Sequence, residues 1–172
     1  MFTTLKTLCS VPSVSGREDK IRNTIKELVA PLCDEVYTDN LGNLIAKKAS
    51  ANKEAKNIML CAHMDEIGFL VTFIEDNGAV RVAPVGGIHS AAVAYTEVVS
   101  ESGVPGVIVP CDDVKAKDYA LDKFYIDLGA KNKKKLRERP ALATSSFVAH
   151  RFAVLLAQEF AADLLTTESA AR

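Results

Sequence analysis

The chain has 172 residues, of which 48% are hydrophobic and 25% are charged, and its formal net charge is −1 at pH 7. This is the composition of an ordinary globular protein. It excludes a disordered chain, a membrane-spanning protein, and a basic protein that holds nucleic acid through its overall charge. We therefore expect one domain, or one domain with an insertion, that has neither nucleic acid nor a membrane as a partner.

The four cysteines, at positions 9, 33, 61 and 111, lie in or beside apolar stretches, and no two of them form a Cys-x-x-Cys pair. This pattern favours buried free thiols in a reducing compartment over a disulfide framework. The first ten residues lack the long apolar core of a signal peptide. Together these features predict a cytoplasmic protein.

Two helices are expected near the N-terminus. The first covers residues 2–8 and stops before Val11-Pro12. In the second, apolar residues recur at helical spacing up to about Leu32, and Ser15 followed by Glu18 fits a capping box at its start. An amphipathic helix of this kind packs one face against a core.

Strands are expected next, at 35–38 and 43–47, on either side of turn-forming residues 39–42. After a charged stretch, residues 57–62 form a short continuous apolar run. That pattern is typical of a strand buried on both faces of an α/β sheet.

The stretch from 68 to about 128 is predicted to be rich in β structure, with turns at Asn77-Gly78 and Ser102-Gly103. The expected strands cover residues 68–74, 79–83, 95–101, 104–109 and 124–128. The apolar run 147–165 then predicts a buried helix. We assign residues 1–67 and 145–172 to a partial α/β domain of catalytic type, and residues 68–144 to a β-rich domain inserted in it.

The chemistry-bearing motif is Ala62-His63-Met64-Asp65-Glu66-Ile67-Gly68, directly after the predicted buried strand. Ligand sites of open α/β sheets lie at the carboxyl ends of strands. The His63 imidazole suits zinc or cobalt, and Asp65 is placed to accept the other ring N–H and so orient that ligand. The alternative is a surface histidine that is hydrogen-bonded to a nearby carboxylate.

This motif, together with Val85-Gly86-Gly87-Ile88, resembles the family of glutamyl aminopeptidases, tetrahedral (TET) aminopeptidases and endoglucanase-like proteins. Further matching blocks follow the family's order along the first 130 residues. They are residues 13–18 (SVSGRE), 39–46 (DNLGNLIA), 103–108 (GVPGVI) and 125–130 (YIDLGA).

The resemblance implies a phosphorylase/hydrolase-like α/β fold, partial here, with a β-rich inserted domain used in assembly. It also implies hydrolysis of N-terminal peptide bonds at a site where two metal ions, zinc or cobalt, share a bridging carboxylate. His63 matches the family's metal-ligand histidine and Asp65 its orienting aspartate. Glu66 and Gly68 match without an assigned role, and Gly86 and Gly87 are expected to serve backbone geometry alone.

The pattern departs from the family beyond residue 130. The family's next landmark is an Asp-Asp-Arg or Asp-Asn-Arg segment whose first aspartate bridges the metals. Its best counterpart here is 148–152, with Ala149 at the bridging position and Arg151 matching. His150 is not expected to replace the carboxylate, because a neutral imidazole does not bridge two ions. We find no counterpart of the later ligands, whereas a catalytic zinc takes about three protein ligands and a water. His89 and Asp112-Asp113 are expected to be surface residues.

Three hypotheses remain open from the sequence. The chain is an incomplete metallo-aminopeptidase, weakly active or inactive by itself and acting on peptides if active. Alternatively, it is a non-catalytic assembly or regulatory partner that uses the β-rich domain. The third hypothesis is an unrelated α/β binding module with a structural His63. We expect a homo-oligomer, because part of the apolar surface of the 57–62 strand must be covered, and we expect the β-rich insert or the 147–165 helix at the interface.

Overall fold

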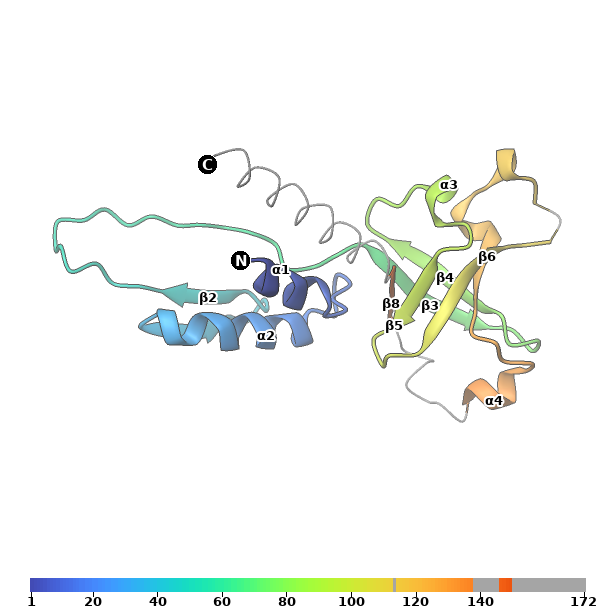
Figure 1. Ribbon diagram of the computed structural model, residues 1–172, viewed down its shortest axis with the longest axis horizontal. Coiled ribbons are helices and arrows are strands. Elements are labelled where there is room, and N and C mark those ends of the chain that lie inside the picture. The colour runs from blue at the N-terminus through green and yellow to red at the C-terminus, as the bar shows by residue number, and fades with distance from the viewer. Residues whose placement is uncertain (113, 138–145, 150–172) are drawn as a thin grey trace, which may run out of the picture.

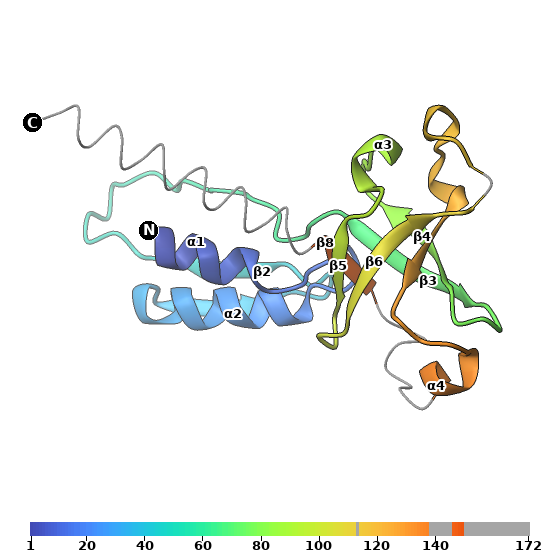
Figure 2. The same cartoon turned by 45° about the vertical axis from the view of Figure 1, so that its right-hand side comes forward.

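The computed structural model describes residues 1–112, 114–137 and 146–149. Helices α1 and α2 and a two-stranded sheet form one end of this part of the chain, and a closed six-stranded barrel forms the other (Figures 1 and 2). The chain therefore combines an α/β portion with a β-rich portion, as the sequence predicted. Among the described helices, none has the length and apolar character needed to cross a membrane.

The N-terminal portion follows the predicted order of two helices and a hairpin. Its elements are α1 (Phe2–Cys9), α2 (Asp19–Val29), the 3-10 turn Ala30–Leu32, β1 (Glu35–Thr38) and β2 (Leu44–Lys47). The two strands pair antiparallel. The apolar face of α2 is only partly covered, since Ile21 is buried but Leu28 is 40% exposed.

The prediction of a strand at 57–62 is wrong. These residues have no regular secondary structure and are exposed, with relative exposures of 85% for Ile58 and Met59 and 93% for Leu60. A strand buried on both faces needs neighbouring strands to take up its backbone hydrogen bonds. Among the described residues, the strands outside the barrel are β1 and β2, and these pair with each other. The apolar run therefore has no described sheet to enter.

The barrel closes in the order β3-β4-β7-β6-β5-β8, and all its neighbouring strands are antiparallel. Its strands are β3 (Gly68–Ile74), β4 (Val80–Val85), β5 (Glu97–Ser100), β6 (Pro105–Pro110), β7 (Phe124–Asp127) and β8 (Ser146–Ala149). Short helices decorate it at α3 (Ser90–Val93), Ala116–Asp118, Leu121–Lys123 and α4 (Lys133–Arg137). The predicted strands from 68 to 128 and the hairpins at Asn77-Gly78 and Ser102-Gly103 are confirmed.

Alternating side chains of the strands fill the barrel. In β6, for example, Ile108 is fully buried while its neighbours Val107 and Val109 are only partly buried. Large side chains of this core include Phe69, Phe124, Ile126 and Phe147, each at most 2% exposed. Burying a side chain of this size contributes roughly 1.5–3 kcal/mol to stability. The barrel is thus the well-packed part of the described chain.

The last described strand corrects the prediction of a helix from Phe147. Residues 146–149 form β8, which pairs with both β3 and β5 and closes the barrel. A short buried apolar run does not distinguish a strand from the start of a helix. This strand also lies in the range 145–172 that we had assigned to the α/β portion. Residues 150–165, the rest of the predicted helix, lie outside the described residues.

The cysteines are all free, as predicted, but the prediction that they are buried is wrong. Cys9, Cys33 and Cys111 are partly exposed and Cys61 is exposed. Cys61 belongs to the exposed segment 57–62, so its exposure has the same cause as the missing strand.

Candidate active site

The loop of residues 13–15 runs along the segment that follows His63. The backbone N–H and the hydroxyl of Ser13 donate to Glu66 Oε1 at 3.0 and 3.3 Å, and the Glu66 N–H donates to the Ser13 carbonyl at 2.9 Å. Val14 and Glu66 form an isolated parallel bridge, and Val14 is fully buried. These contacts fix the backbone at Glu66.

Ser15 makes the next contact along the same loop. Its hydroxyl donates to Asp65 Oδ2 at 2.5 Å. The predicted capping box of Ser15 and Glu18 is therefore wrong. Glu18 is itself the N-cap residue of α2, and its carboxylate accepts the Gly16 N–H at 2.6 Å. The hydroxyl of Ser15 is engaged fifty residues away instead.

Asp65 also accepts a hydrogen bond from His63. The Nδ1 atom of the ring lies 2.9 Å from Asp65 Oδ1 and 3.0 Å from the Asp65 carbonyl oxygen. The hydrogen bonds from Ser15 and then His63 hold the pKa of Asp65 below its usual value. A carbonyl and an ionised carboxylate accept only, so Nδ1 carries the hydrogen, and in the neutral ring the lone pair is then on Nε2. The neutral ring with its hydrogen on Nδ1 is the tautomer with which a histidine binds a metal through Nε2.

Glu66 differs from Asp65 in its electrostatics. Burial raises the pKa of its carboxyl group, and the hydrogen bonds from Ser13 oppose this only in part. Asp65, which is held as a carboxylate, thus stands next to a group whose ionisation is disfavoured. Neighbouring carboxyl groups with such different environments are common at functional sites.

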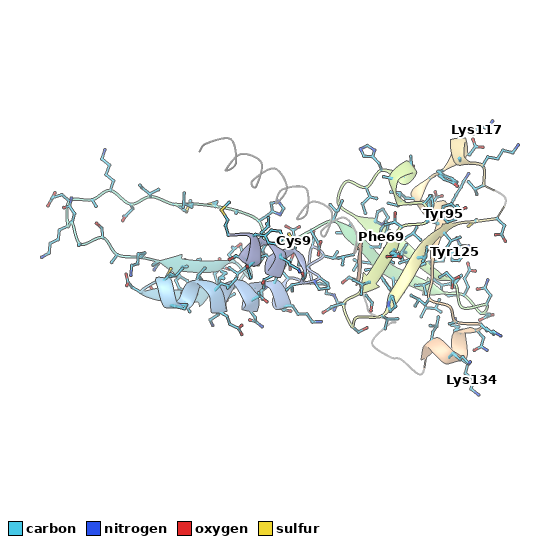
Figure 3. The ribbon with its side chains drawn as sticks, in the orientation of Figure 1. Cys9, Phe69, Tyr95, Lys117, Tyr125 and Lys134 are labelled. Atoms are coloured by element: carbon cyan, nitrogen blue, oxygen red, sulfur yellow. The ribbon has the colours of Figure 1, made fainter. Side chains whose placement is uncertain are left out.

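A cleft of about 590 Å³ lies beside these residues, between the helices and the barrel. Figure 3 shows two residues of its lining, Cys9 at the end of α1 and Phe69 on β3. Residues 63–68 form another part of its lining, and most of the remainder is apolar. The apolar lining residues include Leu8, Ile21, Ile25, Ile67, Ile88, Ala92 and Val93. The cleft therefore suits an apolar group held next to the polar residues 63–66.

Two glycines allow the chain to pass this point. A Cβ atom on Gly68 would lie 2.5 Å from both the Phe147 carbonyl oxygen and Val14 Cγ2, so the backbones approach too closely for any side chain. Gly86 has φ +84°, and a Cβ there would lie 2.5 Å from Ile67 Cγ2. The expected backbone role of Gly86 is confirmed, whereas Gly87 has no such neighbour.

The described residues do not by themselves fit a metal centre. They contain no group of three or more His, Cys, Asp or Glu side chains placed to hold an ion. His63 offers one ligand atom, while a zinc site takes three or four from the protein. Ala149 lies in β8, and His150 lies outside the described residues. His89 is exposed, as predicted, and lines the cleft; Asp112 is exposed as well, and Asp113 lies outside the described residues.

The serines of the 13–15 loop are the site residues that sequence reasoning missed. The capping-box pattern gave Ser15 a local role, and Ser13 received none. The available signal was the order of the family-like blocks, since SVSG precedes the His-x-Asp motif, but that order does not reveal a contact across fifty residues.

Comparisons with known proteins agree with the motifs. The M42 glutamyl aminopeptidase family matches residues 42–165. The lysyl aminopeptidase of Pyrococcus furiosus is 35% identical over 146 residues, covering 78% of this chain and 41% of that protein. An aminopeptidase structure from Desulfurococcus kamchatkensis is 32% identical, with a TM-score of 0.77 over 86% of this chain and 42% of that one. The TET1 peptidase of Pyrococcus horikoshii, described as assembling into a tetrahedron or a large octahedral shell, is 30% identical, with a TM-score of 0.71 over 84% and 45%.

The comparisons also set the extent of the match. The chain spans 37–41% of the length of four curated aminopeptidase relatives.

Proposed function

The chain belongs to the M42 glutamyl aminopeptidase family, and we propose from this that it contributes to metal-dependent release of N-terminal residues from peptides, with His63 as a metal ligand and Asp65 as the residue that orients it. Membership of the family overturns the hypothesis of an unrelated α/β binding module. The observation that carries the proposal is the bond from His63 Nδ1 to Asp65, which leaves Nε2 as a free ligand atom beside an apolar cleft.

The 172-residue chain alone is proposed to be weakly active or inactive. Its described residues supply one ligand where a dinuclear centre needs several, and Ala149 occupies the position matched to the bridging aspartate. The remaining ligands would have to come from polypeptide that corresponds to the rest of the relatives' length. We propose zinc or cobalt as the metal, which would activate the water that attacks the peptide bond.

The second candidate function is a non-catalytic assembly or regulatory partner. It is favoured by the closed barrel, whose core comes mainly from its own strands, and by the exposed apolar residues outside it, including Ile58, Met59 and Leu60. Consecutive exposed apolar residues of this kind suit an interface with another protein. We propose that the chain forms a homo-oligomer or associates with a longer family member.

We also propose a cytoplasmic location, in keeping with the four free cysteines.

Metal content and activity separate the two candidates. The purified chain is incubated with zinc or cobalt, desalted, and analysed for bound metal by mass spectrometry. Release of N-terminal residues is then assayed with glutamyl, lysyl and leucyl chromogenic substrates. His63→Ala is the test variant and His89→Ala the control, because both histidines line the cleft but only His63 is bonded to Asp65.

Metal binding or activity that is lost in His63→Ala and kept in His89→Ala supports the ligand role. Equal metal binding by the wild type and His63→Ala would contradict the ligand role of His63. If no metal binds but light scattering shows association with a full-length relative, the assembly role is the better account.

A further inference from the structure

The side chain of His63 has few constraints in this structure. It is 85% exposed, and the residues before it are exposed and outside any strand. Within the described residues, its ring is hydrogen-bonded through Nδ1 alone, and both acceptors belong to Asp65. The orientation of the ring therefore depends on how firmly Asp65 is held.

Asp65 is held by its second carboxylate oxygen. Oδ1 faces His63, and Oδ2 accepts the hydroxyl of Ser15 at 2.5 Å. A carboxylate turns easily about its last side-chain torsion, because that torsion has a broad energy profile. Donors on both oxygens restrict this rotation, so the bond to Ser15 constrains the oxygen that His63 uses.

Ser15 is in turn fixed by the adjoining contacts of its loop. Ser13 bonds to Glu66 through its backbone and its hydroxyl, and Val14 is buried beside Gly68. The loop therefore holds two consecutive carboxylates with two serines. Only one of these serines, Ser15, contacts the carboxylate that faces the histidine.

From this arrangement we propose that Ser15 is a positioning residue, which acts through Asp65 to hold His63 in the tautomer with the hydrogen on Nδ1 and a free lone pair on Nε2. The meaning of this role rests on the proposed function, since that lone pair is the one offered to a divalent metal. The positioning itself is a property of the chain without metal.

The test measures the tautomer of His63 directly. The full 172-residue chain is labelled with ¹⁵N, and long-range ¹H–¹⁵N correlation spectra are recorded without metal at pH 8, where neutral imidazole predominates. The chain has three histidines, so the signals of His63 are assigned with a His63→Gln variant. The Nδ1 and Nε2 shifts then report which nitrogen carries the hydrogen.

We expect the wild type to show mainly the Nδ1–H form. Ser15→Ala shifts His63 toward the tautomer mixture of an unconstrained histidine, whereas Ser15→Thr, which keeps the hydroxyl, restores the wild-type shifts. Ser13→Ala is the matched control, because it removes a neighbouring hydroxyl that bonds to Glu66 rather than Asp65. Asp65→Ala gives the reference shifts of a ring that has lost the carboxylate and keeps only the backbone carbonyl of residue 65 as an acceptor. Amide spectra verify that each variant is folded.

Three results would overturn the proposal: a wild-type His63 that is not in the Nδ1–H form, a Ser15→Ala variant with unchanged shifts, or equal changes in Ser13→Ala and Ser15→Ala. None of these depends on metal binding. A chain that binds no metal but shows the expected tautomers would contradict the proposed function and leave the role of Ser15 standing.

Discussion

The Ser15 hydroxyl donates a 2.5 Å hydrogen bond to Asp65, joining the N-terminal loop to a carboxylate fifty residues further along the chain. The neighbouring pair, Ser13 and Glu66, is also joined by hydrogen bonds, from the backbone N–H and the hydroxyl of Ser13 to the Glu66 carboxyl group. These two contacts lie where the helical portion meets the barrel, since β3 begins at Gly68. They therefore couple the stability of the N-terminal loop to the geometry at His63.

Removing the Ser15 hydroxyl should destabilise the folded chain. A hydrogen bond to a charged group contributes about 1.5–3 kcal/mol, and Asp65 is partly exposed, so Ser15→Ala should lower the free energy of unfolding by about 1–2 kcal/mol. Urea denaturation followed by circular dichroism measures this. Ser10→Ala is the control, since its exposed hydroxyl bonds only to the Lys6 carbonyl within the same helical turn. Equal stabilities of the two variants would contradict the prediction.

A methyl group at Gly68 should also destabilise the chain. Its Cβ would lie 2.5 Å from a backbone oxygen of Phe147 and from Val14 Cγ2, and a backbone atom cannot move aside cheaply. Overpacking of this kind costs about 1–3 kcal/mol, so Gly68→Ala should lower the melting temperature clearly. Gly87→Ala is the matched control, because nothing lies within 4 Å of its added Cβ and its φ is not positive. That variant should be neutral or slightly stabilising. If the Gly68→Ala and Gly87→Ala variants have the same melting temperature, the backbones of β3 and β8 do not approach each other as closely as the structure shows.

The barrel strands and residues 57–62 together show how far the sequence determines the fold. The barrel strands from Gly68 to Asp127 follow from alternating apolar residues and from turns such as Asn77-Gly78, because both signals are local. The strand predicted at 57–62 rests on the same kind of signal, but a central strand also needs partners, and the described residues offer none. Strand β8 was missed for the converse reason, since its pairing with β3 and β5 depends on distant residues.

The candidate site divides in the same way. The His63–Asp65 pair was predicted because the two residues are near in sequence and their chemistry is specific, and the structure places them 2.9 Å apart. The contacts of Ser13 and Ser15 span about fifty residues and leave no local pattern. Glu18 follows Ser15 at the spacing of a capping box, which predicts a local role for Ser15, but Glu18 itself is the N-cap residue of α2.

Glu66 should make the stability of the chain depend on pH. Burial raises its pKa in the folded chain above the ordinary value of 4.5. A carboxyl group with a raised pKa stabilises the fold below its unfolded pKa, and this contribution is lost as the pH rises through the folded pKa. Glu66→Gln cannot ionise, and its amide oxygen still accepts the Ser13 N–H. We therefore expect the free energy of unfolding of Glu66→Gln, relative to that of the wild type, to increase as the pH is raised from 4 to 7.5.

Urea denaturation at both pH values measures that gain. Glu54→Gln, in the exposed 48–56 loop, is the control for removing one negative charge. A difference between Glu66→Gln and wild type that is the same at pH 4 and pH 7.5 would show that the Glu66 carboxyl is not perturbed by folding.

Tyr95 should be a point of backbone strain. Among the described non-glycine residues it alone has a positive φ, at 61°, and it lies between α3 and β5 on the barrel (Figure 3). Its N–H donates to the Ile108 carbonyl at 2.7 Å, which holds this conformation in place. The left-handed region costs a residue with a Cβ about 1–2 kcal/mol, and glycine avoids that cost but loses about 0.5–1 kcal/mol through the entropy of the unfolded chain.

Tyr95→Gly should therefore raise the free energy of unfolding by about 0.5–1 kcal/mol, as measured by thermal or urea denaturation. The side chain is 67% exposed, so little packing is lost with it, but it does have a hydrogen bond with Tyr119. Tyr95→Phe controls for that bond, because it removes the hydroxyl and leaves the backbone conformation unchanged. If Tyr95→Gly is less stable than Tyr95→Phe, the side chain contributes more than the strain costs, and the positive φ is then sustained by its contacts as well as by the bond to Ile108.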